Sequence, residues 1–374
     1  MDSSRTGPGA TGRPTEPVPA LTVSDYGNRS TTIISTIVDN FYRQAIANRN
    51  RQAVEDAGYL SRIDPNLNQD RINFLILGIG GEGFLTDSIQ ILSYRVQTNT
   101  IALISLPRDL MAPEIIAKAK TQGYDYTNSR LNQALAMGSA RYGYNDAEGL
   151  AFTKTVVEDA TGIAVDYAAV INFNWVTGFI NNTMGKIPIH LDAAIHDSSA
   201  HLDIAAGDHL IDGNTAIQLA RSRYTTSDFA RSSRQQLVIK GYLQAYKGYM
   251  TDTNHGLLDK VSMLFRTRSS IIEGQQKNQL ITDFNLGDLV LNQLSSVPKL
   301  AILLNQSNIG EFPEIVNGVS VSNQDLAGVV NSGVESANIP NISLLKMKGK
   351  NPLTDSPTTY WDNLRTAVKY SLAP

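Results

Sequence analysis

Apolar residues along the 374-residue chain fall first into continuous runs of strand length. Such runs are typical of strands buried on both faces, whereas strands exposed on one face alternate apolar and polar residues. The runs cover residues 71–79, 88–94, 101–106, 165–173 and 186–191. The last one contains Pro188, which cannot donate to a strand ladder, so we expect it at a sheet edge.

Other segments repeat their apolar residues at helical spacing. Residues 33–55 show this spacing, and Asp64 and Pro65 break the helical pattern after them. Residues 229–247 show it too, after a candidate N-cap at Ser227 or Asp228 and before a closing glycine. The remaining predicted helices are 129–142, 146–161, 174–184 with Asn174 as its cap, 257–265, 275–284, 286–294 and 360–370, and the remaining predicted strands are 300–304 and 342–345. This alternation predicts an α/β protein with a three-layer α/β/α arrangement around a mixed central sheet.

Composition narrows the class of protein. The net charge of −3 argues against broad nucleic-acid binding, and the absence of cysteine excludes disulfides, thiolate nucleophiles and zinc–thiolate sites. No apolar run approaches the ~18 residues that a membrane span needs, and no signal-peptide pattern is present. The chain as given is therefore expected to be soluble, which leaves open whether an anchor was removed.

Arginines gather in one stretch of the sequence. Arg221 and Arg223 lie two apart after an apolar run, so in an extended segment their side chains would leave the same face. Arg231, Arg234 and Gln235 share a face of the next predicted helix. Cations near a helix N-terminus cost roughly 0.3–1 kcal/mol each. A bound phosphate would offset this cost, while a solvated basic face paired with surface carboxylates is the alternative interpretation.

Two strand ends carry further candidate ligands. The glycine-rich loop 78–83 matches the dinucleotide fingerprint formally, but no helix begins there, so we interpret it as a loop that lets a ligand approach the backbone. Asp87 follows it and either faces a ligand or caps the turn. Arg108 and Asp109 follow the strand 101–106, where α/β proteins bind ligands, although a structural salt bridge would also explain the pair.

Four histidines lie in or beside the polar segment 192–209, which we expect to be irregular. Their spacing fits neither a helical pair nor a known zinc pattern, so they are interpreted as surface residues. They are His190, His196, His201 and His209.

Several short blocks follow one another between residues 71 and 246. They are Arg71–Gly78, Thr86–Ser88, Ser105–Asp109, Leu131–Asn132, Val165–Tyr167, Val170–Phe173, Gly185–Pro188, Leu210–Ala216, Arg221–Arg223, Asp228–Arg231 and Arg234–Gln235. In this order the blocks resemble the LytR-CpsA-Psr family of bacterial cell-envelope proteins. The resemblance covers about half the chain.

The resemblance implies a phosphotransferase that moves a glycopolymer, as its sugar-1-phosphate, from a polyprenyl-pyrophosphate carrier to a peptidoglycan hydroxyl. It implies a pyrophosphate groove with an apolar tunnel for the isoprenoid tail, and a location in the cell envelope outside the cytoplasmic membrane. The implied partners are the lipid-linked glycan, the peptidoglycan acceptor and the membrane surface reached through the lipid substrate, with no nucleic acid. Composition, periodicity and the resemblance together predict four parts. Residues 1–30, rich in Gly, Pro, Ser and Thr, form a disordered tail or linker, and residues 31–64 an N-terminal helical segment. Residues 65–250 form the family-like catalytic domain, and residues 251–374 an α/β extension packed on it.

The resemblance also assigns roles by position. It implies Mg²⁺ as cofactor, with Asp87 as its ligand and Glu82 as a substitute second carboxylate. The implied catalytic residues are Asp87, Arg108 and Asp228, the last as a base or as an arginine orienter, and the implied phosphate ligands are Arg108, Arg221, Arg223, Arg231 and Gln235. Two positions depart from the family pattern, because Gly80 and Leu85 stand where members often carry an aspartate and an arginine.

Phosphoryl transfer is chemically consistent with this residue set, since it needs charge neutralisation and positioning more than covalent help. Two alternatives use the same residues: a pyrophosphatase, in which water replaces the sugar hydroxyl, and a polyprenyl-phosphate-binding module for envelope regulation without turnover. Magnesium dependence separates the enzymes from the module. We expect Arg231 to be exposed, so that Arg231→Ala leaves the fold intact while removing phosphate binding.

Overall fold

A computed structural model describes residues 33–80, 85–124, 129–139, 147–222, 228–284, 314–320, 334–339, 342–347 and 354–372. Its centre is a six-stranded sheet in the order β10-β3-β2-β1-β4-β9. The strands are β1 (Arg71–Ile79), β2 (Thr86–Arg95), β3 (Thr100–Ser105), β4 (Tyr167–Asn172), β9 (Leu280–Thr282) and β10 (Glu314–Ser320). The β1–β4 and β3–β10 pairs are parallel and the other pairs antiparallel, which confirms the predicted mixed sheet.

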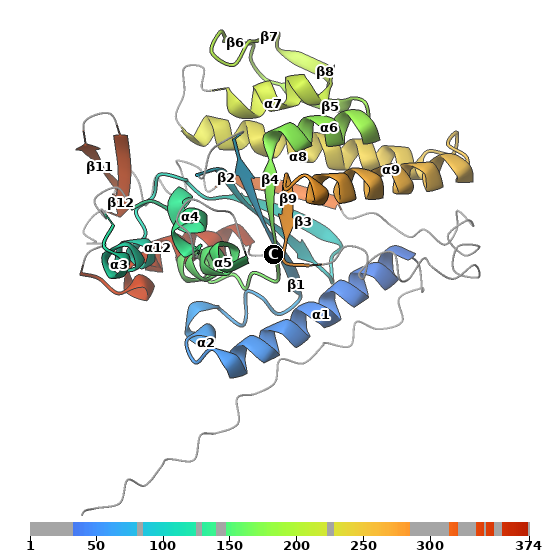
Figure 1. The fold of residues 1–374 in the computed structure, drawn as a ribbon. Helices are drawn as coiled ribbons and strands as arrows, with labels where there is room; N and C mark the ends of the chain where they lie inside the picture. The colour runs from blue at the N-terminus through green and yellow to red at the C-terminus, as the bar shows by residue number, and fades with distance from the viewer. Residues whose placement is uncertain are drawn as a thin grey trace, which may run out of the picture.

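Helices cover both faces of the sheet (Figure 1). Leu75 and Leu77 of β1 join one apolar cluster with the helices α3 (Pro113–Gln122), α4 (Ala134–Gly138), α5 (Ala147–Thr161) and α12 (Pro357–Leu372). Ile72 and Phe74 join a cluster on the other face, with α1 (Ile33–Glu55) and with Ile239 of α8 (Asp228–Thr251). Because strand side chains alternate between faces, one continuous apolar run supplies two cores.

The helices α6, α7 and α8 and two hairpins lie above the sheet in Figure 1, and a third apolar cluster packs among them. The helices are α6 (Phe173–Thr183) and α7 (Gly213–Arg221), and the hairpins pair β5 (Ile187–Leu191) with β8 (Gly207–Ile211) and β6 (Ile195–Asp197) with β7 (Leu202–Ile204). The helix α9 (Leu257–Gln276) packs on α6, where Trp175 Nε1 donates to the carbonyl of Ser270 at 2.8 Å. The remaining elements are α2 (Tyr59–Arg62), η1 (Leu131–Gln133), β11 (Val334–Ile339) and β12 (Ile342–Met347).

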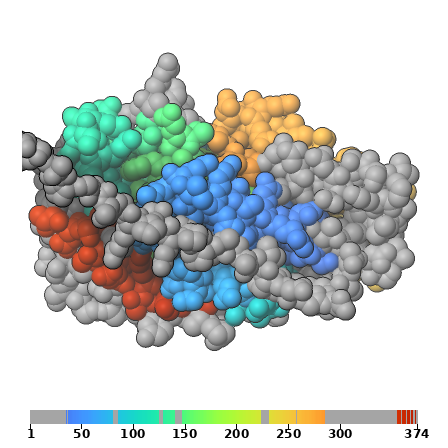
Figure 2. All heavy atoms as spheres, turned by 90° about the horizontal axis from the view of Figure 1, so that it is seen from below, coloured from blue at the N-terminus to red at the C-terminus, as the bar shows by residue number. Residues whose placement is uncertain are grey.

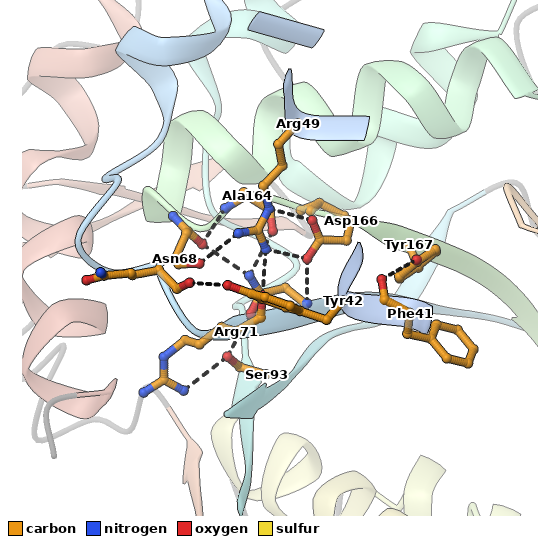
Figure 3. A network of polar contacts seen from close by, with 12 residues as sticks. Phe41, Tyr42, Arg49, Asn68, Arg71, Ser93, Ala164, Asp166 and Tyr167 are labelled. Atoms are coloured by element: carbon orange, nitrogen blue, oxygen red, sulfur yellow. Dashed lines mark hydrogen bonds and ion pairs between the residues drawn. The ribbon is translucent and has the colours of Figure 1, made fainter. Parts of the chain in front are cut away.

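The helix α1 is held to the sheet by a buried polar network (Figure 3). Arg49 donates from Nε and Nη2 to the two carboxylate oxygens of Asp166, each at 2.6 Å. Its Nη1 donates to the Asn68 carbonyl at 2.7 Å, and its Nη2 also donates to the Arg71 carbonyl at 2.8 Å. The same carboxylate accepts from the Asn73 backbone amide at 2.8 Å. Figure 2 shows α1 across the centre of the face seen from below. Residues 33–55 therefore form a helix that covers the core of the sheet.

Several predicted elements are confirmed, among them β1, β2, β3, β4, α1, α5, α8 and α12, to within a few residues at each end. The segment 192–209, predicted to be irregular, contains β6, β7 and part of β8. The predicted helix 275–284 is wrong, since α9 ends at Gln276 and β9 then pairs with β4. Neither α3 nor β10 was predicted. Residues 286–294 and 300–304, like the predicted tail, lie outside the described residues.

Two local predictions near the site also need correction. Arg221 ends the helix α7 rather than a strand, because Asp212 caps that helix by accepting from the Thr215 backbone amide at 2.8 Å and Ala216, Leu219 and Ala220 are buried at helical spacing. The cap of α6 is Asn172, whose side chain accepts from the Asn174 amide at 2.8 Å. None of the helices in the described part of the chain combines the length and apolar character needed to span a bilayer.

Candidate functional site

A polar cavity of about 610 Å³ lies where β2, α7 and α8 meet. Asp87 comes from the start of β2 and Arg221 from the last residue of α7, while Arg231 and Gln235 lie one turn apart near the beginning of α8. The fold therefore brings four of the predicted site residues to one cavity, across about 150 residues of sequence. The arginine side chains of the cavity are suited to bind an anion, and the carboxylate is suited to a cation that such an anion also binds.

Arg108 is connected to this cavity indirectly, by its hydrogen bond to Asp87. Its Nη1 donates to Asp87 Oδ1, and its Nε lies 3.6 Å from Asp109 Oδ2. Asp109 also accepts from Arg130 Nη1 at 2.9 Å. Arg108 is thus part of a chain of alternating charges that orients Asp87, and it is not among the side chains that line the cavity. Its predicted contact with phosphate stays a prediction.

The environment of Asp87 fits a magnesium ion that is shared with a substrate. The side chain is 35% exposed, and Arg108 occupies only one of its oxygens. A Cβ at Gly80 would lie 3.2 Å from the other oxygen, so the glycine leaves that side of the carboxylate uncrowded. Mg²⁺ commonly binds through one or two carboxylates together with substrate phosphates and water. Among the described residues no group of three acidic, histidine or cysteine side chains could hold an ion, and Glu82 lies outside those residues.

An apolar pocket of about 290 Å³, called the tunnel below, adjoins the polar cavity and lies between the sheet and the helices α6 and α8. Both spaces are lined by Phe173, Ile217, Ala220 and Gln235. Along α8 the tunnel wall extends from Gln235 to Leu243 and includes Val238, Ile239 and Tyr242. Its other walls include Ile76, Gly78, Leu92, Ile171, Trp175, Val176, Phe179 and Ile180. A long hydrocarbon joined to a charged head group would fit this combination.

Close packing at Gly78 shapes the entrance of the tunnel. A Cβ at this position would lie 2.8 Å from Phe173 Cε1 and 3.0 Å from the Ser88 side chain. The glycine is therefore required for the approach of Phe173 to β1, and the glycine-rich start of the loop 78–83 serves packing at this position. This residue was singled out from the sequence as part of a ligand-binding loop, and its structural role could not be read there.

Gln235 is fixed at the junction of cavity and tunnel by other side chains. Its Oε1 accepts from Gln90 Nε2 at 3.2 Å, and its Nε2 donates to the Ala220 carbonyl at 3.4 Å. Gln90 in turn accepts from Ser105 Oγ at 2.6 Å, and Ser105 accepts from Gln236 Nε2 at 2.6 Å. The buried network orients Gln235 from β2, β3 and α8, and its predicted contact with phosphate stays a prediction.

The arginines of the site differ from the sequence expectation. Arg231 is only 5% exposed, so the expectation of an exposed side chain is wrong, whereas Arg221 is exposed. Arg234 donates to the Ser222 carbonyl at 3.0 Å, just beyond the end of α7, and is not among the residues that line the cavity. Arg221 is the last residue of a helix, where an extended segment was expected.

Three predicted site residues cannot be placed. Glu82, Arg223 and the side chain of Asp228 lie outside what the structure describes, although α8 begins at Asp228 as predicted. Conversely, sequence reasoning missed the walls contributed by Phe173, Ile217 and the hairpin residues Ser199–His201. The sequence shows that Ile217 is an apolar residue, but it does not show that a cavity lies beside it.

Comparison with known proteins identifies the family. The model of the LytR_cpsA_psr family matches residues 35–289. This chain belongs to the LytR_cpsA_psr family. The match extends beyond the blocks that carried the resemblance, and includes most of α1 and all of β9.

Two teichoic acid transferases are among the proteins that the chain is similar to. It is 22% identical over 230 residues to the polyisoprenyl-teichoic acid–peptidoglycan teichoic acid transferase TagU of Bacillus cereus, covering 60% of this chain and 66% of TagU. It is 25% identical over 201 residues to the polyisoprenyl-teichoic acid–peptidoglycan teichoic acid transferase TagT of Bacillus subtilis, covering 50% and 56%. The chain therefore spans less than two thirds of the length of these relatives.

A solved structure has a fold similar to that of this LytR_cpsA_psr family protein. The crystal structure of B. subtilis TagV superposes with a TM-score of 0.50 at 16% sequence identity, covering 81% of this chain and 97% of TagV. This similarity supports the α/β/α arrangement and shows nothing of the substrates.

Proposed function

We propose that this LytR_cpsA_psr family protein transfers a glycopolymer, as its sugar-1-phosphate, from a polyprenyl-pyrophosphate carrier to a peptidoglycan hydroxyl. The observation that carries the proposal is that the polar cavity and the apolar tunnel adjoin and share four lining residues, Phe173, Ile217, Ala220 and Gln235. A polyprenyl-pyrophosphate glycan has the same order of parts: a hydrocarbon chain, two phosphates and a sugar. The names of TagU and TagT, which pair a polyisoprenyl-linked teichoic acid with peptidoglycan, support this substrate class.

In this proposal the acceptor oxygen forms a bond to the phosphorus that carries the sugar, and the bond from that phosphorus to the polyprenyl phosphate breaks. Arg221 and Arg231 would neutralise charge on the phosphate oxygens, since guanidinium groups stay protonated and match phosphate in two-point contacts. The proton of the acceptor hydroxyl would pass to a carboxylate, for which Asp228 is the candidate from the sequence. Polyprenyl phosphate is the leaving group, and its hydrocarbon tail stays in the tunnel when the bond breaks.

Asp87 is the residue that would hold Mg²⁺ in this proposal, with Glu82 as the second candidate. When bound, the ion would supply positive charge to the phosphate oxygens and help to orient them. Arg108 holds Asp87 in place by donating to one of its oxygens, so the carboxylate is preorganised before substrate binds. Preorganised groups contribute more to catalysis because they need not reorganise during the reaction.

The proposal is tested by transfer of a labelled polyprenyl-pyrophosphate oligosaccharide to soluble peptidoglycan fragments, with Mg²⁺ or with a chelator. We expect a covalent product that forms only with the metal. Asp87→Asn keeps the size of the side chain but removes its charge, and should lower the transfer rate by ~10²-fold or more with near-normal binding of the lipid. An unchanged rate in this variant would contradict the assignment of Asp87.

One observation favours a second candidate function, a binding module for polyprenyl phosphate in envelope regulation. The glycine at position 80 places no side chain beside Asp87, so the described part of the site contains one carboxylate where a metal-dependent transferase could use two. Tight lipid binding that survives the chelator, with no product, would support this module. Release of free sugar phosphate without transfer would instead identify a pyrophosphatase.

A further inference from the structure

The polar cavity has two unlike walls. Asp87, Arg221 and Arg231 lie on β2, α7 and α8, beside the entrance of the tunnel. The other wall is the turn between β6 and β7, which contributes Ser199, Ala200 and His201. This turn presents a hydroxyl, a methyl group and an imidazole, and it carries neither a carboxylate nor a guanidinium. The hydroxyl and the imidazole can hydrogen-bond to sugar hydroxyls, whereas the arginine side is suited to phosphate.

The position of this turn is fixed relative to the arginine side. Asp197, which is 5% exposed, accepts through Oδ1 from the Ser199 amide and hydroxyl at 3.0 and 2.6 Å and from the Ala200 amide at 3.1 Å. Its Oδ2 accepts from Ser222 Oγ at 2.7 Å, and Ser222 directly follows Arg221. One buried carboxylate therefore connects the turn to the end of α7 and sets the width of the cavity.

His201 differs from the other histidines of this region. His190 and His196 pair with Asp208 and Asp203 at 2.6 and 2.7 Å, and His209 contacts the Ala205 carbonyl at 2.8 Å. The imidazole of His201 has no hydrogen-bond partner among the described residues, and it is the one of the four that lines the cavity. All four had been interpreted from the sequence as surface residues. The structure places His201 both at the surface and at a candidate site.

The backbone of His201 supports a role for its side chain. Its φ is +52°, a conformation that glycine and asparagine adopt at lower cost than other residues. Its amide donates to the Ser198 carbonyl at 3.3 Å, a turn contact that glycine would make equally well. The turn therefore gains nothing from an imidazole, and a non-glycine residue at positive φ on a cavity wall is a reason to look for a function.

We propose that His201 binds the acceptor, by a hydrogen bond between its imidazole and a hydroxyl of the incoming peptidoglycan sugar, with Ser199 completing this side of the cavity. The inference rests on the proposed function and specifies which wall receives the acceptor. The donor pyrophosphate then lies against the arginines and the acceptor against the hairpin, so that the reacting oxygen and phosphorus meet between them. His201 would contact only the acceptor, and donor binding would not depend on it.

The variant His201→Gly tests this assignment without straining the turn. Glycine suits φ +52°, so the variant should fold at least as well as the wild type. We expect the KM for a soluble peptidoglycan fragment to rise about tenfold, the order of one lost hydrogen bond, with an unchanged KM for a polyprenyl-pyrophosphate disaccharide. His201→Gln, which keeps a donor and an acceptor, should recover part of the loss. His196→Ala, on the same hairpin and away from the cavity, is the matched control and should behave as the wild type.

The outcomes separate the two proposals. An unchanged acceptor KM in His201→Gly, or equal rises in the donor and acceptor KM, would overturn the role of His201 and leave the transferase intact. A wild-type protein that binds the donor but forms no product with any acceptor would overturn the proposed function, and the acceptor assignment with it. Loss of activity in the His196→Ala control would show that the effect is structural, and would also overturn the assignment.

Discussion

At the scale of single residues, the two cavity arginines contribute in different ways. Arg231 is 5% exposed, so its aliphatic stem is packed against neighbours, and removing the side chain would remove packing as well as charge. Arg221 is exposed at the end of α7 and lines the same cavity. A loss of lipid binding in Arg231→Ala would therefore be ambiguous, whereas the same loss in Arg221→Ala would report on the cavity itself.

We predict that Arg221→Ala changes the free energy of unfolding by less than ~0.5 kcal/mol and weakens binding of polyprenyl pyrophosphate roughly 10- to 100-fold. The physical reason is the loss of hydrogen bonds to a charged phosphate from a side chain that the fold does not need. Binding is measured by calorimetry and stability by urea unfolding. Arg266→Ala, an exposed arginine of α9, is the control. If Arg221→Ala binds lipid as tightly as this control does, Arg221 is not a phosphate ligand.

At the scale of elements, α1 depends on one buried side chain. Arg49 is 2% exposed and forms a two-point ion pair with Asp166, whose side chain is fully buried. Burial acts to lower the pKa of Arg49, but the opposite carboxylate raises it above its ordinary value. The pair connects α1 to the segment before β4, while Tyr42 and Tyr167 add hydrogen bonds between α1 and its surroundings at 2.6 and 2.8 Å.

We predict that Arg49→Ala lowers the free energy of unfolding by ~3–5 kcal/mol, because it leaves the Asp166 carboxylate buried without its partner. Urea unfolding followed by circular dichroism measures the change. The control is Arg43→Ala, an exposed arginine of the same helix, which should cost less than ~0.5 kcal/mol. A similar small cost for both variants would mean that α1 is held by its apolar face alone.

At the scale of the whole molecule, the last helix packs against elements from the first half of the chain. Trp361 of α12 donates to Glu114 of α3 at 2.7 Å, and Arg71 of β1 donates to the carbonyl of Leu372 at 2.8 Å. Burial raises the pKa of Glu114 to about 8, against the hydrogen bonds that lower it. The second carboxyl oxygen, Oε2, is buried and has no hydrogen-bond partner among the described residues, an environment that costs more for a charged carboxylate than for a neutral carboxyl.

This arrangement predicts a pH-dependent stability. The unfolded state loses the Glu114 proton near pH 4.5 and the folded state only near pH 8, so the folded state binds more protons between these values and its stability falls as the pH rises. Glu114→Gln keeps the contact with Trp361 and has no proton to lose. We expect it to match the wild type at about pH 5 and to exceed it by on the order of 2 kcal/mol at about pH 9, measured by thermal and urea unfolding. A parallel pH dependence of the two proteins would contradict the role of Glu114.

Local interactions determined a large part of this structure, and the sequence shows them. Apolar runs and helical spacing predicted β1 to β4, α1 and α8 because each pattern depends on neighbours within a few residues. The order of short motifs also predicted the family and four residues of the cavity: Asp87, Arg221, Arg231 and Gln235.

Long-range packing decided the rest. Arg231 is buried, β9 pairs with β4, and Arg234 contacts the end of α7. Each of these depends on segments that are far apart in the sequence and meet in the fold, so no local sequence pattern records them. The cavity and tunnel likewise exist only where β1, β2, α6, α7 and α8 come together. The sequence by itself determined the elements and the chemistry available to them. Tertiary structure alone decided which side chains face the cavity, among them His201, because burial and proximity follow from the packing of the whole chain.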